Sequence, residues 1–391
     1  MLLLSRKNQR FAKEQAPYQS TSLTAMTLRR FRKDTMAMVS TGVILLFTLM
    51  AILGYLITPD HTPYCNHQYL ELATMKPFSK ATFLCVDTPT LTEGTHMDDI
   101  QQSYETSRRC GWLGRMIHGE PLPYTAIPIY SHKEVGDYIE VETFTGSTPN
   151  DGEIQRYRKS DVVKIEQRTF VFGTDGYGRD VLSQIMIGSR VSLSVGFIAI
   201  FIALVIGITL GALAAYYGGW VDNVIMWLIN VVWSIPTVLL VIAITFALGK
   251  GFWQVFVAVG LTMWVDIARV VRGQVFSIKE KEYVEAARAL GYSTFRIIFR
   301  HILPNILGAV IVVTASNFAS AILLEAGLSF LGIGVQPPMP SWGSMVKENY
   351  AYILLDSAYL ALLPGLAIMI IVLAFMLLGN GVRNSLDIKN Q

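Results

Sequence analysis

The sequence predicts an all-α membrane protein that crosses the bilayer several times and carries one β-rich insert on its outer side. Of its 391 residues, 52% are hydrophobic and only 16% are charged, and the mean hydropathy is +0.42. This composition lies outside the range of soluble globular proteins. Long apolar runs recur along the chain, and one long polar stretch separates the first run from the others.

Six apolar runs are predicted to be transmembrane helices, because about 20 helical residues cross the hydrocarbon core. They lie at 36–57, 191–217, 224–248, 252–265, 306–331 and 359–378. The fourth run is short and must extend through Val271, which brings Asp266 and Arg269 near the interface. The first helix, placed at 36–58, follows a basic leader too long for a cleavable signal, so it is expected to be an uncleaved anchor. The other five form a predicted transmembrane domain at 188–380.

The distribution of basic residues predicts the orientation. The tail at 1–35 holds a cluster of them: Arg6, Lys7, Arg10, Lys13, Arg29, Arg30, Arg32 and Lys33. By the positive-inside rule this tail is cytoplasmic. With six spans, the basic loop at 273–303 and the C-terminal tail at 381–391 are cytoplasmic too. A nucleic-acid role is not expected, since the basic tail lacks interleaved aromatic residues and topology explains it.

Residues 59–187 are predicted to be extracytoplasmic, comprising an inserted subdomain and a surface linker. Residues 59–119 look irregular, whereas 123–172 look strand-like. Within that part, 138–144 and 161–166 alternate polar and apolar residues, which is the period of half-buried strands. A small β-rich subdomain is therefore expected, and it has no assigned role.

All three cysteines, Cys65, Cys85 and Cys110, fall in this outer segment. Because that compartment is oxidising, one disulfide is expected, and the sequence leaves all three pairings open. A metal site formed with His61, His67 or His118 is disfavoured, because no two ligands have C-x-x-C or H-x-x-x-H spacing. No metal and no cofactor is expected.

Residues 282–304, EYVEAARALGYSTFRIIFRHILP, form a polar helical segment between two apolar runs. Helical spacing places two sets of side chains on common faces: Tyr283, Ala286, Ala287 and Leu290 in the first helix, and Phe295, Ile298, Phe299 and Ile302 in the second. A glycine between them, Gly291, is expected to end the first helix with a positive φ. The segment is suited to lie along the membrane surface and contact a soluble partner, although an ordinary helical loop would show the same periodicity.

This segment resembles the EAA loop of ATP-binding-cassette importer permeases, whose motif is EAA, three residues, Gly, nine residues and I-x-L-P. The matching residues are Glu285, Ala286, Ala287, Gly291, Leu303 and Pro304. His301 stands where the motif usually has an apolar residue, a departure familiar in the peptide-importer branch. The resemblance implies that the matching residues couple the permease to an ATPase.

The stretch FGTDGYGRD at 172–180 invites comparison with a phosphate-binding loop. Val181 stands where G-x-G-x-x-G needs glycine, and no Gly-Lys-Ser/Thr follows, so that reading fails. The stretch instead resembles the GTDxxGRD signature of the oligopeptide/dipeptide permease family. Residues 217–222, 328–345 and 379–387 resemble the same family, so the resemblance covers about residues 170–391. The long outer segment departs from the family pattern.

Two residues are candidates for the substrate path. Pro236 is expected to kink or break the third span, which is tolerable where a water-lined cavity satisfies the freed carbonyl. Glu325 is the only deep carboxylate, and it either contacts substrate or hydrogen-bonds to a neighbouring helix. Small residues in the second and fifth spans, Gly196, Gly207, Gly211, Ala315, Ser316, Ala319 and Ser320, predict close helix packing.

No catalytic residue is predicted, because the chain holds no nucleophile elbow, no H-E-x-x-H pair and no paired carboxylates at a defined spacing. The resemblance implies a type I permease fold in the bacterial cytoplasmic (inner) membrane and an ATP-driven importer of peptides. Implied partners are a second homologous permease, two cytoplasmic ATP-binding subunits, an extracytoplasmic binding protein and membrane lipid. Alternatives are the same machine importing nickel chelates or another small solute, and, in a different class, a secondary carrier.

Overall fold

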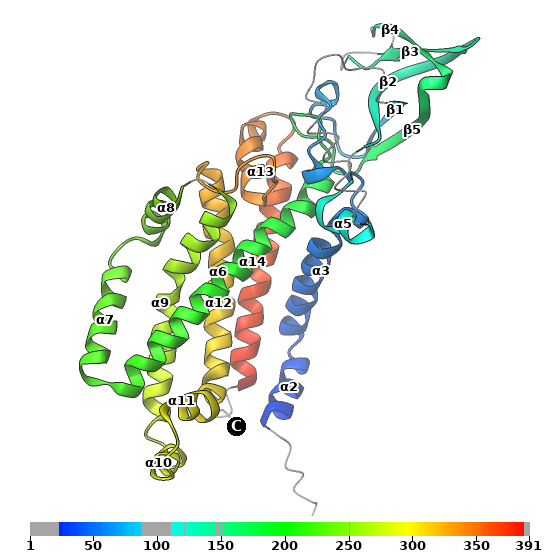
Figure 1. The fold of residues 1–391 in the computed structure, drawn as a ribbon. Helices are drawn as coiled ribbons and strands as arrows, with labels where there is room; N and C mark the ends of the chain where they lie inside the picture. The colour runs from blue at the N-terminus through cyan, green and yellow to red at the C-terminus, as the bar shows by residue number, and fades with distance from the viewer. Residues whose placement is uncertain are drawn as a thin grey trace, which may run out of the picture.

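The computed structural model describes residues 23–87, 111–120, 122–145, 149, 152–249 and 251–386. These residues form a helical bundle with a small antiparallel sheet at one end (Figure 1). The longer helices are α2 (Leu23–Lys33), α3 (Thr35–Ile57), α6 (Val181–Tyr217), α7 (Gly219–Trp233), α8 (Thr237–Leu248), α9 (Phe252–Ile278), α12 (Leu303–Phe330) and α14 (Tyr359–Leu386). Shorter ones are α5 (Gly111–His118), α10 (Glu282–Ala289), α11 (Thr294–Arg296) and α13 (Trp342–Asn349).

Within the described residues, five helices are long and apolar enough to cross a membrane, namely α3, α6, α9, α14 and the continuous stretch Thr294–Phe330. A sixth span requires α7 and α8 to be counted together, although they are bent by 93°. The bend falls at Pro236, as predicted, because proline offers no backbone N–H to continue the helix. The count is therefore five or six.

Helices α6, α9 and α14 are longer than the predicted spans, and α14 continues from the predicted end at 378 to Leu386, into the segment predicted as the C-terminal tail. Helix α6 begins at Val181, where Asp180 caps it by accepting a hydrogen bond from Ser183 N at 2.9 Å. Helix α9 continues through Ile278, well past the short apolar run. Its charged end is accommodated because Arg272 forms a two-pronged ion pair with Asp222 of α7, with both N–O distances 2.6 Å.

Glycines allow α6 and α9 to pack closely, as predicted for the second span. A Cβ at Gly207 would lie 2.8 Å from Trp264 O, and a Cβ at Gly211 would lie 2.5 Å from Ala268 O. Gly196 similarly leaves room for the ring of Phe318 in α12. The backbones thus approach too closely for any other residue, which is the usual basis of tight contact between membrane helices.

The sheet has the strand order β4-β3-β2-β1-β5, and neighbouring strands are antiparallel. Its strands are β1 (Ser79–Asp87), β2 (Tyr124–Val135), β3 (Tyr138–Thr143), β4 (Ile154–Arg158) and β5 (Val162–Phe170). The predicted strands at 138–144 and 161–166 correspond to β3 and β5. The start of β1 and the end of β5 lie side by side, since Phe78 N donates to Phe170 O at 2.8 Å.

The expectation that residues 59–119 are irregular is wrong for two parts of that segment. Strand β1 lies between β2 and β5, and it packs Phe83 on one face and Leu84 on the other. Because both faces are buried, the strand shows no polar–apolar alternation that the sequence could reveal. Helix α5 also forms there and contacts α3.

The cysteines do not form the expected bond in the part of the chain that the structure describes. Cys65 and Cys85 are free and buried, and they belong to different apolar clusters. Cys65 Sγ instead donates a hydrogen bond to Asp60 O at 3.1 Å. Cys110 lies outside the described residues. Among the described histidines, cysteines and carboxylates, no group of three could hold a metal ion.

The close contact between α6 and α9 predicts unequal effects for two glycine-to-alanine changes. Gly211→Ala should destabilise the protein by about 1–3 kcal/mol, because the added methyl group overlaps the backbone of α9. Gly42→Ala in α3 is the control, since nothing lies within 4 Å of its Cβ. That variant should be neutral or more stable, because alanine favours a helix by about 0.5–1 kcal/mol over glycine. Thermal unfolding of the purified protein measures both; equal midpoints would contradict the packing argument.

Candidate functional site

The segment at 282–304 forms a helix, a turn and a second helical stretch at the end of the bundle opposite the sheet (Figure 1). Gly291 has φ +74°, the left-handed conformation expected for a glycine that ends a helix. Tyr292 N donates to Ala287 O at 3.1 Å, and Gly291 N donates to Arg288 O at 2.9 Å. These bonds satisfy the last carbonyls of α10. Ser293 then caps α11, accepting a hydrogen bond from Arg296 N at 3.4 Å.

Helix α10 buries a narrower strip than the common face that its spacing predicts. Of the four side chains predicted to share one face, only Ala287 is buried, and the structure buries Val284 with it, whereas Tyr283, Ala286 and Leu290 are exposed. Val284 and Ala287 are also at helical spacing, and they pack against the apolar core of the bundle. The sequence alone could not choose between these two faces, because tertiary packing decides which one is buried.

The second stretch is divided in the same way. Of the four residues predicted to share a face, Ile298 and Ile302 are buried, whereas Phe295 and Phe299 are 69% and 52% exposed. Here the chain forms a π-helix at Ile297–Ile302 between α11 and α12. The rings of Phe295 and Phe299 pack together with centroids 4.3 Å apart. The turn ends at Leu303 and Pro304, the first residues of α12, where proline needs no hydrogen-bond partner.

The result is a surface on which apolar and charged side chains are interleaved. Its exposed apolar residues are Tyr283, Leu290, Tyr292, Phe295 and Phe299. Glu285 and Ala286 are exposed beside them, and Glu285 makes no ion pair with any described residue. Exposed apolar patches rimmed by polar groups mark protein–protein contact sites. We call this the coupling surface.

A second feature is a cavity of about 240 Å³ beside the break between α7 and α8. Its walls come from four helices: Val232 and Trp233 of α7, Thr237 and Leu240 of α8, Thr262, Met263, Val265 and Asp266 of α9, and Asn317, Ser320 and Leu324 of α12. Pro236 immediately precedes Thr237 in the chain, and Trp233 lies three residues before it. The sequence did not single out Trp233, whose ring lies 3.7 Å from Arg269 Cζ. Only the fold brings these two residues together.

Glu325 does not line this cavity. Its side chain is fully buried, and it accepts hydrogen bonds from Ser192 Oγ of α6 at 3.3 Å and from Ser329 Oγ at 2.7 Å. Ser192 Oγ in turn accepts a hydrogen bond from Trp342 N of α13 at 3.4 Å. Glu325 therefore links three helices, which agrees with the hydrogen-bonding alternative drawn from the sequence.

The GTDGYGRD turn joins the segment that carries the sheet to the bundle. Asp175 is almost fully buried and accepts hydrogen bonds from Arg179 N at 2.9 Å and Arg179 Nε at 2.7 Å. The same guanidinium donates to Glu348 of α13 at 2.6 Å and to Asn66 at 3.0 Å. Burial opposes the charge on Arg179, but the two carboxylates outweigh it and raise the pKa of this residue.

Backbone contacts complete this junction. Tyr69 N donates to Tyr177 O at 3.1 Å, Thr74 N donates to Asp175 O at 2.9 Å, and Thr174 Oγ1 donates to Leu72 O. The backbone N–H groups that a phosphate would need are also occupied, since those of Tyr177 and Arg179 donate to Asp175 Oδ1 and that of Gly178 donates to Asp175 O, consistent with the rejection of a phosphate site. A structural role for this turn follows from the bonds.

Comparison with known proteins identifies the bundle. Residues 207–389 match the family described as binding-protein-dependent transport system inner membrane component, and residues 22–77 match the N-terminal TM domain of oligopeptide transport permease C. The chain is 42% identical over 217 residues to the glutathione transport system permease protein GsiD of Pectobacterium atrosepticum, covering 56% of this chain and 72% of that protein. The chain belongs to the oligopeptide/dipeptide family of ATP-binding-cassette importer permeases.

Two further proteins are similar to this permease. The dipeptide transport system permease protein DppC of Alkalihalophilus pseudofirmus is 43% identical over 218 residues, covering 56% of this chain and 71% of that protein. A solved structure of the MetNI methionine ABC transporter in an inward-facing conformation aligns at 20% identity with a TM-score of 0.43, covering 52% of this chain and 97% of that chain. Residues 78–206 fall outside both matched families.

The family fixes the general role of the chain. It is a multi-pass membrane protein and the permease subunit of an ATP-binding-cassette importer. Permeases of this kind are the non-catalytic transport component and work with ATP-binding and substrate-binding partners.

The junction predicts a large effect for Arg179→Gln. The variant would leave Asp175, which is 1% exposed, and Glu348 without their shared cation. Removing one partner of a buried ion pair typically costs about 3–5 kcal/mol, so we expect a loss near the lower limit because Glu348 is partly exposed. Thermal unfolding of the purified permease measures it. Lys159→Gln, which removes the exposed pair with Glu134, is the control and should leave the midpoint unchanged. Equal midpoints for the two variants would contradict this role of the junction.

Proposed function

We propose that this permease carries peptides across the inner membrane, as one half of a channel that it forms with a second, homologous permease. Two cytoplasmic ATP-binding subunits would drive it, and an extracytoplasmic binding protein would deliver the cargo. The relatives named for glutathione and dipeptides support a peptide cargo. The observation that carries the proposal is the coupling surface, which combines a motif, an exposed apolar patch and an unpaired carboxylate.

In this proposal Glu285, Ala286, Ala287, Gly291, Leu303 and Pro304 form the coupling element. The exposed Glu285 is available to pair with a basic group of an ATPase, and the small side chain of Ala286 allows the partner's backbone to approach. Ala287, Leu303 and Pro304 connect this surface to the bundle, because Ala287 is buried and the other two begin α12. A pull on α10 would therefore be transmitted to the transmembrane helices, the rigid-body switching that alternating access requires.

The proposed translocation path runs past the break at Pro236. The adjacent cavity has polar groups at membrane depth, including Thr262, Asn317 and Ser320. Broken helices in membranes are tolerated where they line a water-filled cavity. Glu325 would hold α6, α12 and α13 together without contacting cargo, because its oxygens already bind serine hydroxyls.

The proposed orientation puts the coupling surface in the cytoplasm and the sheet outside. Figure 1 shows α2, α10 and the C-terminal end of α14 at one end of the bundle and the sheet at the other. Helix α2 carries Arg29, Arg30, Arg32 and Lys33 near its end, which favours the cytoplasmic side. The proposed domains are a cytoplasmic tail (1–35), a first span (36–58), an outer subdomain with its linker (59–187), a transmembrane domain (188–380) with the loop 273–303, and a C-terminal tail (381–391). The outer subdomain would dock the binding protein.

Topology can be measured with single cysteines in a background whose three native cysteines are replaced by serine. Ser160 follows β4 and Ser277 lies near the end of α9, and both are exposed. A membrane-impermeant thiol reagent applied to intact spheroplasts should label Ser160→Cys and not Ser277→Cys. Permeabilised cells should show both labelled, which controls for reactivity. Labelling of Ser277→Cys alone in intact cells would reverse the orientation.

Coupling can be measured with the assembled importer in proteoliposomes. Gly291→Val should lower ATP-driven dipeptide uptake by about tenfold or more, because a β-branched residue at positive φ carries a strain of about 1–3 kcal/mol. Space is not the problem, since nothing lies within 4 Å of a Cβ there. Gly291→Asn is the matched control, because asparagine tolerates this conformation, and it should retain most of the uptake.

The same assay tests the cargo. The permease should take up labelled dipeptide, and unlabelled tripeptide or glutathione should reduce this uptake by competition. That result would support a peptide importer. Uptake of a nickel chelate without peptide uptake would assign the other cargo. Wild-type uptake by Gly291→Val would remove the coupling role from this turn.

A further inference from the structure

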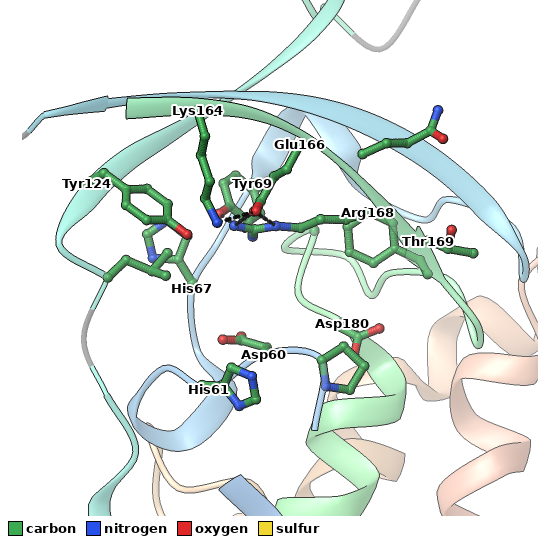
Figure 2. A pocket seen from close by; sticks show the side chains of 15 residues that line it. Asp60, His61, His67, Tyr69, Tyr124, Lys164, Glu166, Arg168, Thr169 and Asp180 are labelled. Atoms are coloured by element: carbon green, nitrogen blue, oxygen red, sulfur yellow. Dashed lines mark hydrogen bonds and ion pairs between the residues drawn. The ribbon is translucent and has the colours of Figure 1, made fainter. Parts of the chain in front are cut away.

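A second cavity, of about 360 Å³, lies between the sheet and the top of the bundle. Figure 2 shows Lys164, Glu166 and Arg168 of β5 on one side of it, and Asp60, His61 and Asp180 on the other. This cavity shares no lining residue with the cavity beside the break at Pro236. Nothing in the proposed transport cycle uses it.

One wall carries two carboxylates without a cation. Asp180 is 7% exposed, and its Oδ1 accepts no hydrogen bond from a described residue. Asp60 Oδ1 accepts a hydrogen bond from Thr62 N at 2.8 Å. No described lysine or arginine forms an ion pair with either carboxylate. Asp180 is the more buried of the two, and its Oδ2 accepts from Ser183 N. Burial, together with the charge of Asp60, raises the pKa of Asp180, so a cationic group at this wall would stabilise its charged form.

The opposite wall has the reverse imbalance. Lys164, Glu166 and Arg168 alternate along β5, so their side chains share one face of the strand. Both cations pair with the single carboxylate of Glu166, which leaves one positive charge in excess. Arg168 also donates to Tyr69 OH at 3.1 Å. Burial raises the pKa of Tyr69 to about 12, so its hydroxyl stays neutral and adds no negative charge to this wall.

We propose that this cavity binds a small zwitterion, with its ammonium group at Asp60 and Asp180 and its carboxylate at Lys164 and Arg168. Each end of such a ligand meets the charge that its wall lacks, and charge-assisted hydrogen bonds are the strong ones. A ligand with only negative groups is disfavoured because it would meet the two carboxylates. A diamine is disfavoured because it would meet the excess positive charge of β5. A cavity of this volume is at the small end of ligand pockets, which fits a free amino acid or a dipeptide.

Isothermal titration calorimetry on the purified full chain in nanodiscs tests this proposal directly. Alanine and dialanine are the probes, and their relative affinities distinguish a free amino acid from a peptide as the ligand. N-acetylalaninamide, which has the same backbone without charges, should not bind, and neither should succinate or putrescine. Saturable binding by a zwitterion alone supports the site. Equal binding of N-acetylalaninamide, or no saturable binding of either zwitterion, would overturn it.

Two variants assign the binding to this cavity. Asp60→Asn keeps the Oδ1 that accepts from Thr62 N but removes the charge, and Lys164→Gln changes a half-exposed residue on the other wall. Each should weaken zwitterion binding by about tenfold, the effect of losing one charged contact. Glu134→Gln, on an exposed pair outside the cavity, is the control and should bind as wild type. Unchanged affinity in both cavity variants, with normal thermal unfolding, would place the ligand elsewhere.

Because the readout is binding, a failure here leaves the proposed transport function untouched, and a failure of uptake leaves this site untouched.

Discussion

The ion pair between Asp175 and Arg179 is the constraint on which the upper half of this permease depends. Asp175 shapes the turn by accepting from the backbone of Tyr177 and Arg179, and Arg179 then reaches out to Glu348. Through these few atoms, one turn fixes where α6 begins, how α13 lies beside it and where the outer segment attaches. A buried ion pair is weak evidence for net stability, because desolvation offsets its attraction. Here the ion pair fixes geometry, because Arg179 binds Asp175, Asn66 and Glu348 at once and so holds three separate chain segments in one arrangement.

The opposite end of the bundle is built on another principle. There the coupling surface leaves aromatic side chains in solvent and holds them through a buried strip that includes Val284 and Ile298. The exposed rings cost hydration free energy until a partner covers them. Thus many buried polar contacts hold the permease together where the sheet-bearing segment attaches. At the other end, the coupling surface leaves apolar side chains exposed where a partner is proposed to bind. This division suits the proposed coupling, because the force of a partner would arrive at the exposed surface and pass to the packed helices.

The sequence predicted features with local causes and missed those with tertiary causes. Gly291 and Pro236 were assigned correctly because a positive φ and a missing N–H belong to the residue itself. Helical spacing placed Tyr283, Ala286, Ala287 and Leu290 on one face, but it could not tell which side of α10 lies against the bundle, and only the fold decides that Val284 is inside. Strand β1 was missed because a strand buried on both faces loses its alternation. The cation–π contact between Arg269 and Trp233 joins residues that no spacing rule connects.

The meeting of the sheet's two ends has a consequence for how this permease could have acquired its outer subdomain. Phe78 N donates to Phe170 O, so the two ends of the sheet lie at nearly one point. An insertion with coincident ends adds mass without changing the distance that the flanking segments must span. A change in the strands or their loops would therefore leave the turn below and its bonds in place, whereas α5, which lies between the two phenylalanines in the chain, is held to the bundle separately by Arg190, which donates to Met116 O and Ile117 O. The sheet is thus an inserted module whose two ends meet beside the GTDGYGRD turn, where Gly173 N donates to Phe170 O at 3.1 Å.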